Sequence, residues 1–210
     1  MEIIKVQVAR AVWLFDTQDL NPRGISLYEP LAALATKFQF AGWPTPEDCG
    51  RFSAAHKSMF FKQGTFLYEG LRVDIDFDIH PDGLVANTHN STEASESFLE
   101  EFLKWASNNL QTTCEGPRER QYRSELAVRM SPNFETFSER VEEYTHKLSD
   151  MFGQPTVFTG IIFGSELTTG VLTIERRANT KFSDNQYFSI SALQTGKHVE
   201  ALVALEALPS

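Results

Sequence analysis

Apolar and polar residues alternate strictly between Leu71 and His80. Such a period of two is typical of a β-strand with one face in the core and the other in water. The tripeptide Pro-Asp-Gly at 81–83 then favours a tight turn, and Leu84 begins a returning apolar segment. The pattern therefore predicts a β-hairpin. Its polar face would carry three carboxylates and an imidazole, which are Asp74, Asp76, Asp78 and His80.

Helical periodicity marks four segments, in which apolar residues recur every three or four positions. They are residues 27–38, 91–109, 131–153 and 196–208. The third segment is the most regular. Its apolar stripe consists of Phe134, Phe137, Val141, Tyr144, Leu148 and Met151. A weaker segment from Pro46 to His56 is predicted to be a loop or a short helical turn.

Six further segments have the apolar, β-branched or aromatic composition of strands. They are residues 2–15, 59–68, 122–130, 157–163, 171–177 and 187–193. The second of these is expected to be broken at Gln63-Gly64. The predicted elements therefore follow the order β-α-β-β-β-α, and the same order repeats after a linker at 111–121.

This order predicts an α+β protein with a largely antiparallel sheet and helices packed on one face. A doubly wound parallel fold is disfavoured, because consecutive hairpin-length connections replace the helical crossovers that such a fold needs. The repeated order also suggests two similar halves, 1–112 and 113–210. One continuous domain is the alternative.

The chain of 210 residues has a formal net charge of −9. An acidic surface repels nucleic acid and anionic membranes, so neither is expected as a direct partner. There is no signal-peptide pattern and no long apolar run, and Cys49 and Cys114 lack the spacing of disulfide or zinc motifs. These observations predict a cytoplasmic protein whose partner is another protein or a second copy of itself.

The acidic strand face is the candidate metal site. Hard divalent cations such as Mn²⁺ or Mg²⁺ bind carboxylate oxygens, and a histidine can complete a manganese site. Alternate residues of one strand lie about 6.6 Å apart, so a single ion cannot reach all of them from one straight strand. The candidate ligands are Asp74, Asp76, Asp78, His80 and, on the returning strand, His89. The simpler interpretation is that these residues form the solvent-exposed face of a hairpin and bind no cofactor.

Two basic clusters are candidate partner-binding sites, because arginine binds carboxylates and phosphates with two parallel hydrogen bonds. One cluster comprises Arg176, Arg177 and Lys181, and the other surrounds the predicted linker with Arg118 and Arg120. Either could receive an acidic partner or the aspartate face of another copy. Ordinary surface and internal ion pairs are the alternative interpretation.

Residue types used in catalysis occur close together at His198 with Glu200 and at Ser124 with Glu125. Neither pair shows the nucleophile, base and orienting group that acyl transfer needs, and no glycine-rich phosphate loop is present. Aromatic residues between positions 43 and 68 are a further candidate: if one small sheet does not bury them all, an exposed remainder would mark an interface, and burial in the core is the alternative interpretation. They are Trp43, Phe60, Phe61, Phe66 and Tyr68.

The leading hypothesis is a non-enzymatic protein-interaction or assembly subunit that associates with itself. It depends on the acidic surface and on the lack of a complete catalytic motif. The alternative is a metal-dependent hydrolase of phosphoesters that uses the face of Asp74, Asp76, Asp78 and His80. An acidic mimic of nucleic acid ranks third, because only the net charge supports it.

Overall fold

The fold is known from a computed structural model, which describes residues 1–15, 19, 21–22, 26–55, 58–110, 116–131, 139–164 and 171–207. The chain divides into two compact units. We call Val8–Arg123 the N-terminal unit, and Met1–Gln7 together with Ser124–Ser210 the C-terminal unit. Each unit is described by itself. The predicted boundary between residues 112 and 113 stays a prediction.

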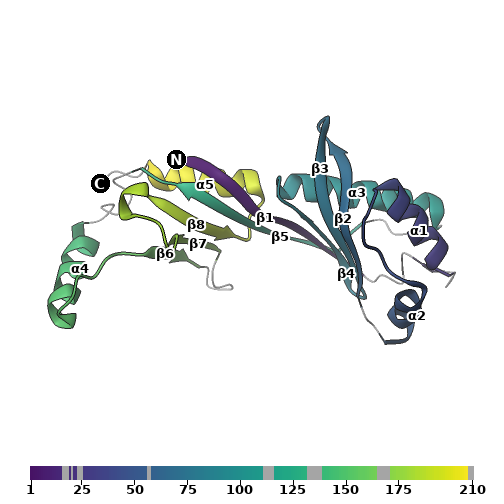
Figure 1. The fold of residues 1–210 in the computed structure, drawn as a ribbon, viewed down its shortest axis with the longest axis horizontal. Helices are drawn as coiled ribbons and strands as arrows, with labels where there is room; N and C mark the ends of the chain where they lie inside the picture. The colour runs from purple at the N-terminus through teal and green to yellow at the C-terminus, as the bar shows by residue number, and fades with distance from the viewer. Residues whose placement is uncertain are drawn as a thin grey trace. The chain divides into compact units, whose positions relative to one another are not determined.

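The elements follow the predicted order, with one additional helix (Figure 1). Up to residue 109 they are β1 (Glu2–Leu14), α1 (Tyr28–Lys37), α2 (Pro46–Ala55), β2 (Met59–Tyr68), β3 (Leu71–His80), β4 (Gly83–Thr88) and α3 (Thr92–Asn109). The remaining ones are β5 (Glu119–Arg129), α4 (Glu139–Phe152), β6 (Gly160–Phe163), β7 (Leu172–Arg176), a short 3₁₀ turn (Phe182–Asp184), β8 (Gln186–Ser191) and α5 (Thr195–Glu206).

The strands form an antiparallel sheet in the order β2-β3-β4-β1-β5-β8-β7-β6. In each half of this order the first strand pairs with the fourth, the fourth with the third and the third with the second. The predicted α+β class with an antiparallel sheet is therefore confirmed. The division into two similar halves, 1–112 and 113–210, stays a prediction.

The core of the N-terminal unit is aromatic and lies between the sheet and its helices. Phe98 of α3 is at its centre, with ring centroids 4.9 Å from Phe38, 5.2 Å from Phe77 and 5.5 Å from Phe66. Helix α3 starts where the sequence predicted, because the Ser91 side chain accepts a hydrogen bond from the Ala94 amide. The alternation in β3 is also confirmed, since its apolar phase is buried against α3 and α1.

Helix α2 is longer than the loop or short turn that was predicted for this segment. The Thr45 hydroxyl accepts from the Asp48 amide, and the Asp48 carboxylate accepts from the Thr45 amide at 3.0 Å. This reciprocal capping box, with Pro46 at the first helical position, starts a ten-residue helix. The capping signal was present in the sequence, but the weak apolar periodicity concealed it.

Strand β2 contains a β-bulge where the sequence predicted a break. Gln63 adopts a φ of 55°, and the register with β3 shifts between Phe61 and Gly64. Glycine is required at position 64, because a Cβ atom there would lie 2.4 Å from the ring of Phe40. The bulge therefore brings the strand edge against the core aromatic cluster.

The outer edge of β2 is covered by the chain's own segment 38–42. The Thr65 amide donates to the Phe38 carbonyl at 2.7 Å, and the Lys62 amide donates to the Gly42 carbonyl at 2.8 Å. Covering segments and bulges are common means of protecting an edge strand from pairing with other chains. Segment 38–42 thus protects the edge of β2 from pairing with another chain.

The C-terminal unit has a smaller core, which α5 covers. Its buried members are Leu126, Val128, Met130, Leu172, Ile174, Tyr187 and Leu202. The apolar stripe predicted for residues 131–153 is only partly covered. Val141 and Leu148 are half-buried, whereas Tyr144 and Met151 are exposed, and Phe134 and Phe137 lie outside the described residues. Among the residues of α4 whose burial the structure describes, none is fully buried, whereas α1 buries Leu31, Leu34 and Ala35.

Strand β5 begins at Glu119, inside the segment that was predicted to be a linker. The sequence pattern did not indicate the start of β5, because its charged residues are exposed and break the apolar alternation. None of the helices in the described ranges is long and apolar enough to cross a membrane.

Candidate functional site

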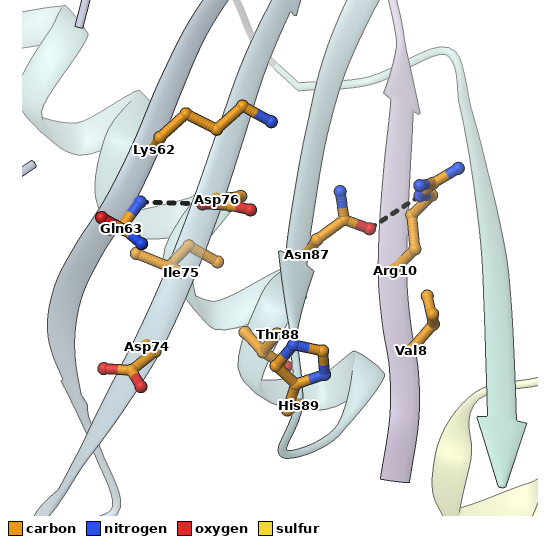
Figure 2. A pocket seen from close by; sticks show the side chains of 10 residues that line it. All are labelled: Val8, Arg10, Lys62, Gln63, Asp74, Ile75, Asp76, Asn87, Thr88 and His89. Carbon is orange, nitrogen blue, oxygen red and sulfur yellow. Dashed lines mark hydrogen bonds between the residues drawn. The ribbon is translucent and has the colours of Figure 1, made fainter. Parts of the chain in front are cut away.

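The face of the N-terminal sheet opposite its helices carries the polar residues. Strand register places Asp76 of β3 beside Asn87 of β4, and Asn87 beside Arg10 of β1. Figure 2 shows these three side chains projecting to the same side, with Lys62 of β2 at the end of the row. The row arises because each strand alternates inward apolar and outward polar residues.

Hydrogen bonds hold two positions of this row. The carboxylate of Asp76 accepts from the backbone amide of Gln63 at 2.8 Å, and Arg10 Nε donates to Asn87 Oδ1 at 2.7 Å. The first of these bonds satisfies an amide that the β-bulge removes from the ladder. Asp76 therefore stabilises the bulge, while Arg10 is oriented by its neighbouring strand.

The row borders an open concavity of about 650 Å³ (Figure 2). Its lining residues are Val8, Arg10, Lys62, Gln63, Asp74, Ile75, Asp76, Asn87, Thr88 and His89. Cationic and anionic groups are both present. Lys62 and Asp74 make no ion pair within the described part of the chain, although Lys62 lies over the Phe60 ring at 5.9 Å from its centroid and its charge acts on Asp78.

Asp78 and His80 lie further along the same strand face. Asp78 Oδ1 is buried and has no hydrogen-bond partner among the described residues. Burial raises the pKa of the Asp78 carboxyl, and the positive charge of Lys62 only partly opposes this shift. His80 Nδ1 lies 2.6 Å from the Ser58 hydroxyl. Since Asp78 makes no hydrogen bond to His80, these groups do not form a hydrogen-bonded triad.

The predicted metal ligands share one face but do not form a coordination site there. Asp74, Asp76 and His89 line the concavity, whereas Asp78 and His80 lie outside its lining. Within the described ranges, no three histidine, cysteine, aspartate or glutamate side chains are grouped closely enough to hold a metal ion. The geometry therefore gives the metal hypothesis no support.

The basic residues near the predicted linker make contacts within the N-terminal unit. Arg120 stacks over Trp13 at 4.8 Å from the ring centroid and pairs with Glu96 at 2.6 Å. The Tyr122 hydroxyl also donates to Glu96 at 3.0 Å. Arg118 is exposed, and its backbone amide donates to the Leu14 carbonyl. The side chain of Arg120 thus makes intramolecular contacts, whereas Arg118 is exposed.

The other basic cluster lies in the C-terminal unit. Arg176 donates to the Tyr187 hydroxyl at 3.0 Å, and Arg177 donates to Gln186 at 3.0 Å while lying over the ring of Phe188. Lys181 is exposed. The two arginines are therefore oriented by strand β8, and only the lysine of this predicted set is fully exposed.

A buried polar cluster in the C-terminal unit was not predicted. His198 of α5 is fully buried between two serines, with Nε2 2.8 Å from Ser189 Oγ and Nδ1 3.0 Å from Ser124 Oγ. Ser189 Oγ already donates to the Thr173 carbonyl, so it accepts from His198 Nε2–H, and Nδ1 accepts from Ser124. Burial lowers the pKa of His198 to about 4. The imidazole is therefore neutral at pH 7.

Sequence proximity suggested different partners for this histidine and serine. His198 was considered with Glu200, and Ser124 with Glu125, but the structure pairs His198 with Ser124 across 74 positions of the chain. No local signal could show this contact. The cluster contains no carboxylate and is closed to solvent, so it joins α5 to strands β5 and β8.

The aromatic residues between positions 43 and 68 are mostly covered. Phe61 and Phe66 are buried, Trp43 stacks on Tyr28, and Tyr68 is half-buried. Only Phe60 remains exposed, with half of its surface accessible. At these five positions the alternative of burial in the core therefore describes all the side chains except Phe60. Compared with models of known protein families and with curated proteins, the sequence matches none.

Proposed function

We propose that this protein is a non-enzymatic interaction or assembly subunit, and that the helix-free face of its N-terminal unit binds a polar surface of a protein partner. The observation that carries this proposal is the concavity with Lys62 and Asp74 at its lining, because both charges lack an ion-pair partner among the described residues. A partner that brings one acidic and one basic group could pair with both.

The composition of the concavity supports a protein partner over a small apolar ligand. Small-molecule sites are mainly apolar and enclosed, whereas this surface is open and lined largely by polar side chains. Polar rows with both charge signs fix the orientation of a partner and discriminate against wrong partners.

The alternative hypothesis, a metal-dependent phosphoester hydrolase, has no specific observation in its favour. Its proposed ligands are distributed along one strand, and Asp76 is hydrogen-bonded to the bulge at Gln63. The two serine–histidine contacts also lack a hydrogen-bonded carboxylate among the described residues.

The test is differential capture of partners by charge-reversed variants. Tagged wild-type protein, Lys62→Glu and Asp74→Lys would be crosslinked in an extract of the source cells, and captured proteins quantified by mass spectrometry. We expect the two variants to lose the same proteins by about tenfold, because like charges facing each other at an interface are costly. Added salt should weaken capture by wild type.

Lys104→Glu is the matched control, because Lys104 is exposed on α3 in the helix layer and undergoes the same charge change as Lys62→Glu. It should capture the same proteins as wild type. If all the variants capture the same proteins equally, the concavity is not the binding surface and the proposal is wrong.

A further inference from the structure

The two terminal strands of the sheet order, β2 and β6, differ in how their outer edges are protected. The edge of β2 carries Lys62 and a bulge, and the segment 38–42 covers it. Strand β6 has no such protection among the described residues. The chain from Gln154 to Gly164 contains no charged residue, and Ile162 is 67% exposed and Phe163 43% exposed. An unprotected apolar edge is a template for pairing with another strand.

The register with β7 identifies the backbone groups that face outward from β6. The amide of Arg176 donates to the carbonyl of Thr159, so this antiparallel pair is hydrogen-bonded. Hydrogen-bonded and non-hydrogen-bonded pairs alternate along such a ladder. The pairs of Ile161 with Ile174 and Phe163 with Leu172 are therefore hydrogen-bonded as well. It follows that the N–H and C=O groups of Gly160 and Ile162 point away from β7.

We propose that this edge pairs with the same edge of a second copy, antiparallel about a two-fold axis. In this register, Gly160 of one copy lies opposite Ile162 of the other, and Ile161 lies opposite its own symmetry mate. Each of the two Gly160–Ile162 pairs exchanges two N–H···O hydrogen bonds. An isologous contact of this kind closes on itself and does not continue into a fibre.

Side-chain shape favours a second copy as the occupant. Gly160 has no side chain, so the branched and exposed Ile162 of the partner copy can pack over it beside the Glu175 side chain, which lies next to this glycine. Glycine is also required there by the fold, because a Cβ atom would lie 2.3 Å from the Ile174 carbonyl. Because the segment from Gln154 to Gly164 contains no charged residue, the pairing strands bring no like charges opposite each other, although the whole chain carries −9.

This inference rests on the proposed function only in assuming that the protein acts through protein contacts, and it uses a different surface. A strand edge of four residues buries far less than a standard interface of about 1,600 Å². The dimer should therefore be weak and dependent on concentration.

The test is sedimentation of the full chain from about 10 μM to about 1 mM, a range in which even a millimolar dissociation constant is detectable. Wild type should form a dimer as its concentration rises. Ile162→Pro should stay monomeric, because it removes an outward N–H without breaking the ladder to β7. Ile162→Lys should also stay monomeric. Val203→Lys, at another exposed apolar position of the same unit, is the matched control and should dimerise.

A wild-type protein that stays monomeric would overturn the inference, and so would a dimer that persists in both Ile162 variants. If those variants fail to fold, amide hydrogen exchange on the wild-type protein tests whether the β6 edges pair. The amides of Gly160 and Ile162 should become protected as concentration rises, and unchanged exchange would contradict the pairing. Loss of dimerisation with retained partner capture would separate this surface from the concavity of the N-terminal unit.

Discussion

Asp74 and Asp76 illustrate how neighbouring residues of one sequence pattern acquire different roles. Both lie on the polar phase of β3, and both line the same concavity. Only Asp76 accepts a hydrogen bond from the bulge amide of Gln63, whereas Asp74 is exposed and makes no hydrogen bond among the described residues. One carboxylate thus stabilises the fold, and the other belongs to the proposed partner contact.

Replacing Asp76 with alanine should destabilise the protein by about 1 kcal/mol, because the bulge amide loses its acceptor. Asp76→Asn keeps an acceptor oxygen and should cost less. Asp74→Ala is the control and should change the free energy of unfolding by less than about 0.5 kcal/mol. Urea denaturation measures all three, and equal losses for Asp74→Ala and Asp76→Ala would contradict a specific role for Asp76.

Helix ends and strand edges explain the differences between predicted and observed elements. The capping box of Thr45 and Asp48 produces α2 in a segment with weak periodicity. Conversely, α4 has the most regular apolar stripe in the sequence, yet Tyr144 and Met151 are exposed. Periodicity reports that a segment can form an amphipathic helix, but it does not show which surface covers the apolar side.

The start of α3 provides a test at this scale. Ser91→Ala should lower the free energy of unfolding by about 1 kcal/mol, because the Ala94 amide loses its capping oxygen. Ser91→Asn should restore most of this loss. Ser107→Ala, at an exposed position in the last turn of the same helix, should instead stabilise by up to about 0.5 kcal/mol through helix propensity. If urea denaturation shows that both alanine variants change the free energy of unfolding in the same direction, the capping role of Ser91 is contradicted.

At the scale of the whole molecule, two units with the same strand order have different interiors. The N-terminal core is built from interlocking aromatic rings around Phe98, whereas the C-terminal core is smaller and includes a neutral histidine. The hydrogen bonds of His198 to Ser124 and Ser189 connect α5 to two strands. Protonation of this imidazole would place an unpaired charge in the core.

His198 should therefore make stability depend on pH in one direction. Its pKa is about 4 in the folded protein and about 6.5 in the unfolded chain, so only the unfolded chain takes up the proton between these values. The contribution of this group is complete above pH 6.5 and is lost as pH falls toward 4, by about 3 kcal/mol in total.

An NMR titration of the imidazole measures this directly, and its ¹⁵N shifts should also report the Nε2–H tautomer. His198→Gln should lower stability at pH 7 and make it less dependent on pH between 6.5 and 4. Titration of His198 near pH 6.5 in the folded protein would show that the ring is not buried as described.

Much of the fold was predictable from the sequence, since the spacing of apolar residues sets the period of each element. The hairpin of β3 and β4, helices α1, α3 and α5, and the antiparallel α+β class follow from that spacing. The candidate site was predictable only in part. The polar phase of β3 was identified, whereas Arg10, Lys62 and Asn87 come from other strands and join it only through register.

By itself, the sequence determined which side of each strand and helix is apolar, because that depends on residues only two to four positions apart. The tertiary structure alone decided which polar groups meet. Asp76 and the Gln63 amide are 13 positions apart, Arg120 and Glu96 are 24 apart, and His198 and Ser124 are 74 apart. Such contacts depend on strand register and on the packing of whole elements, which local patterns do not encode.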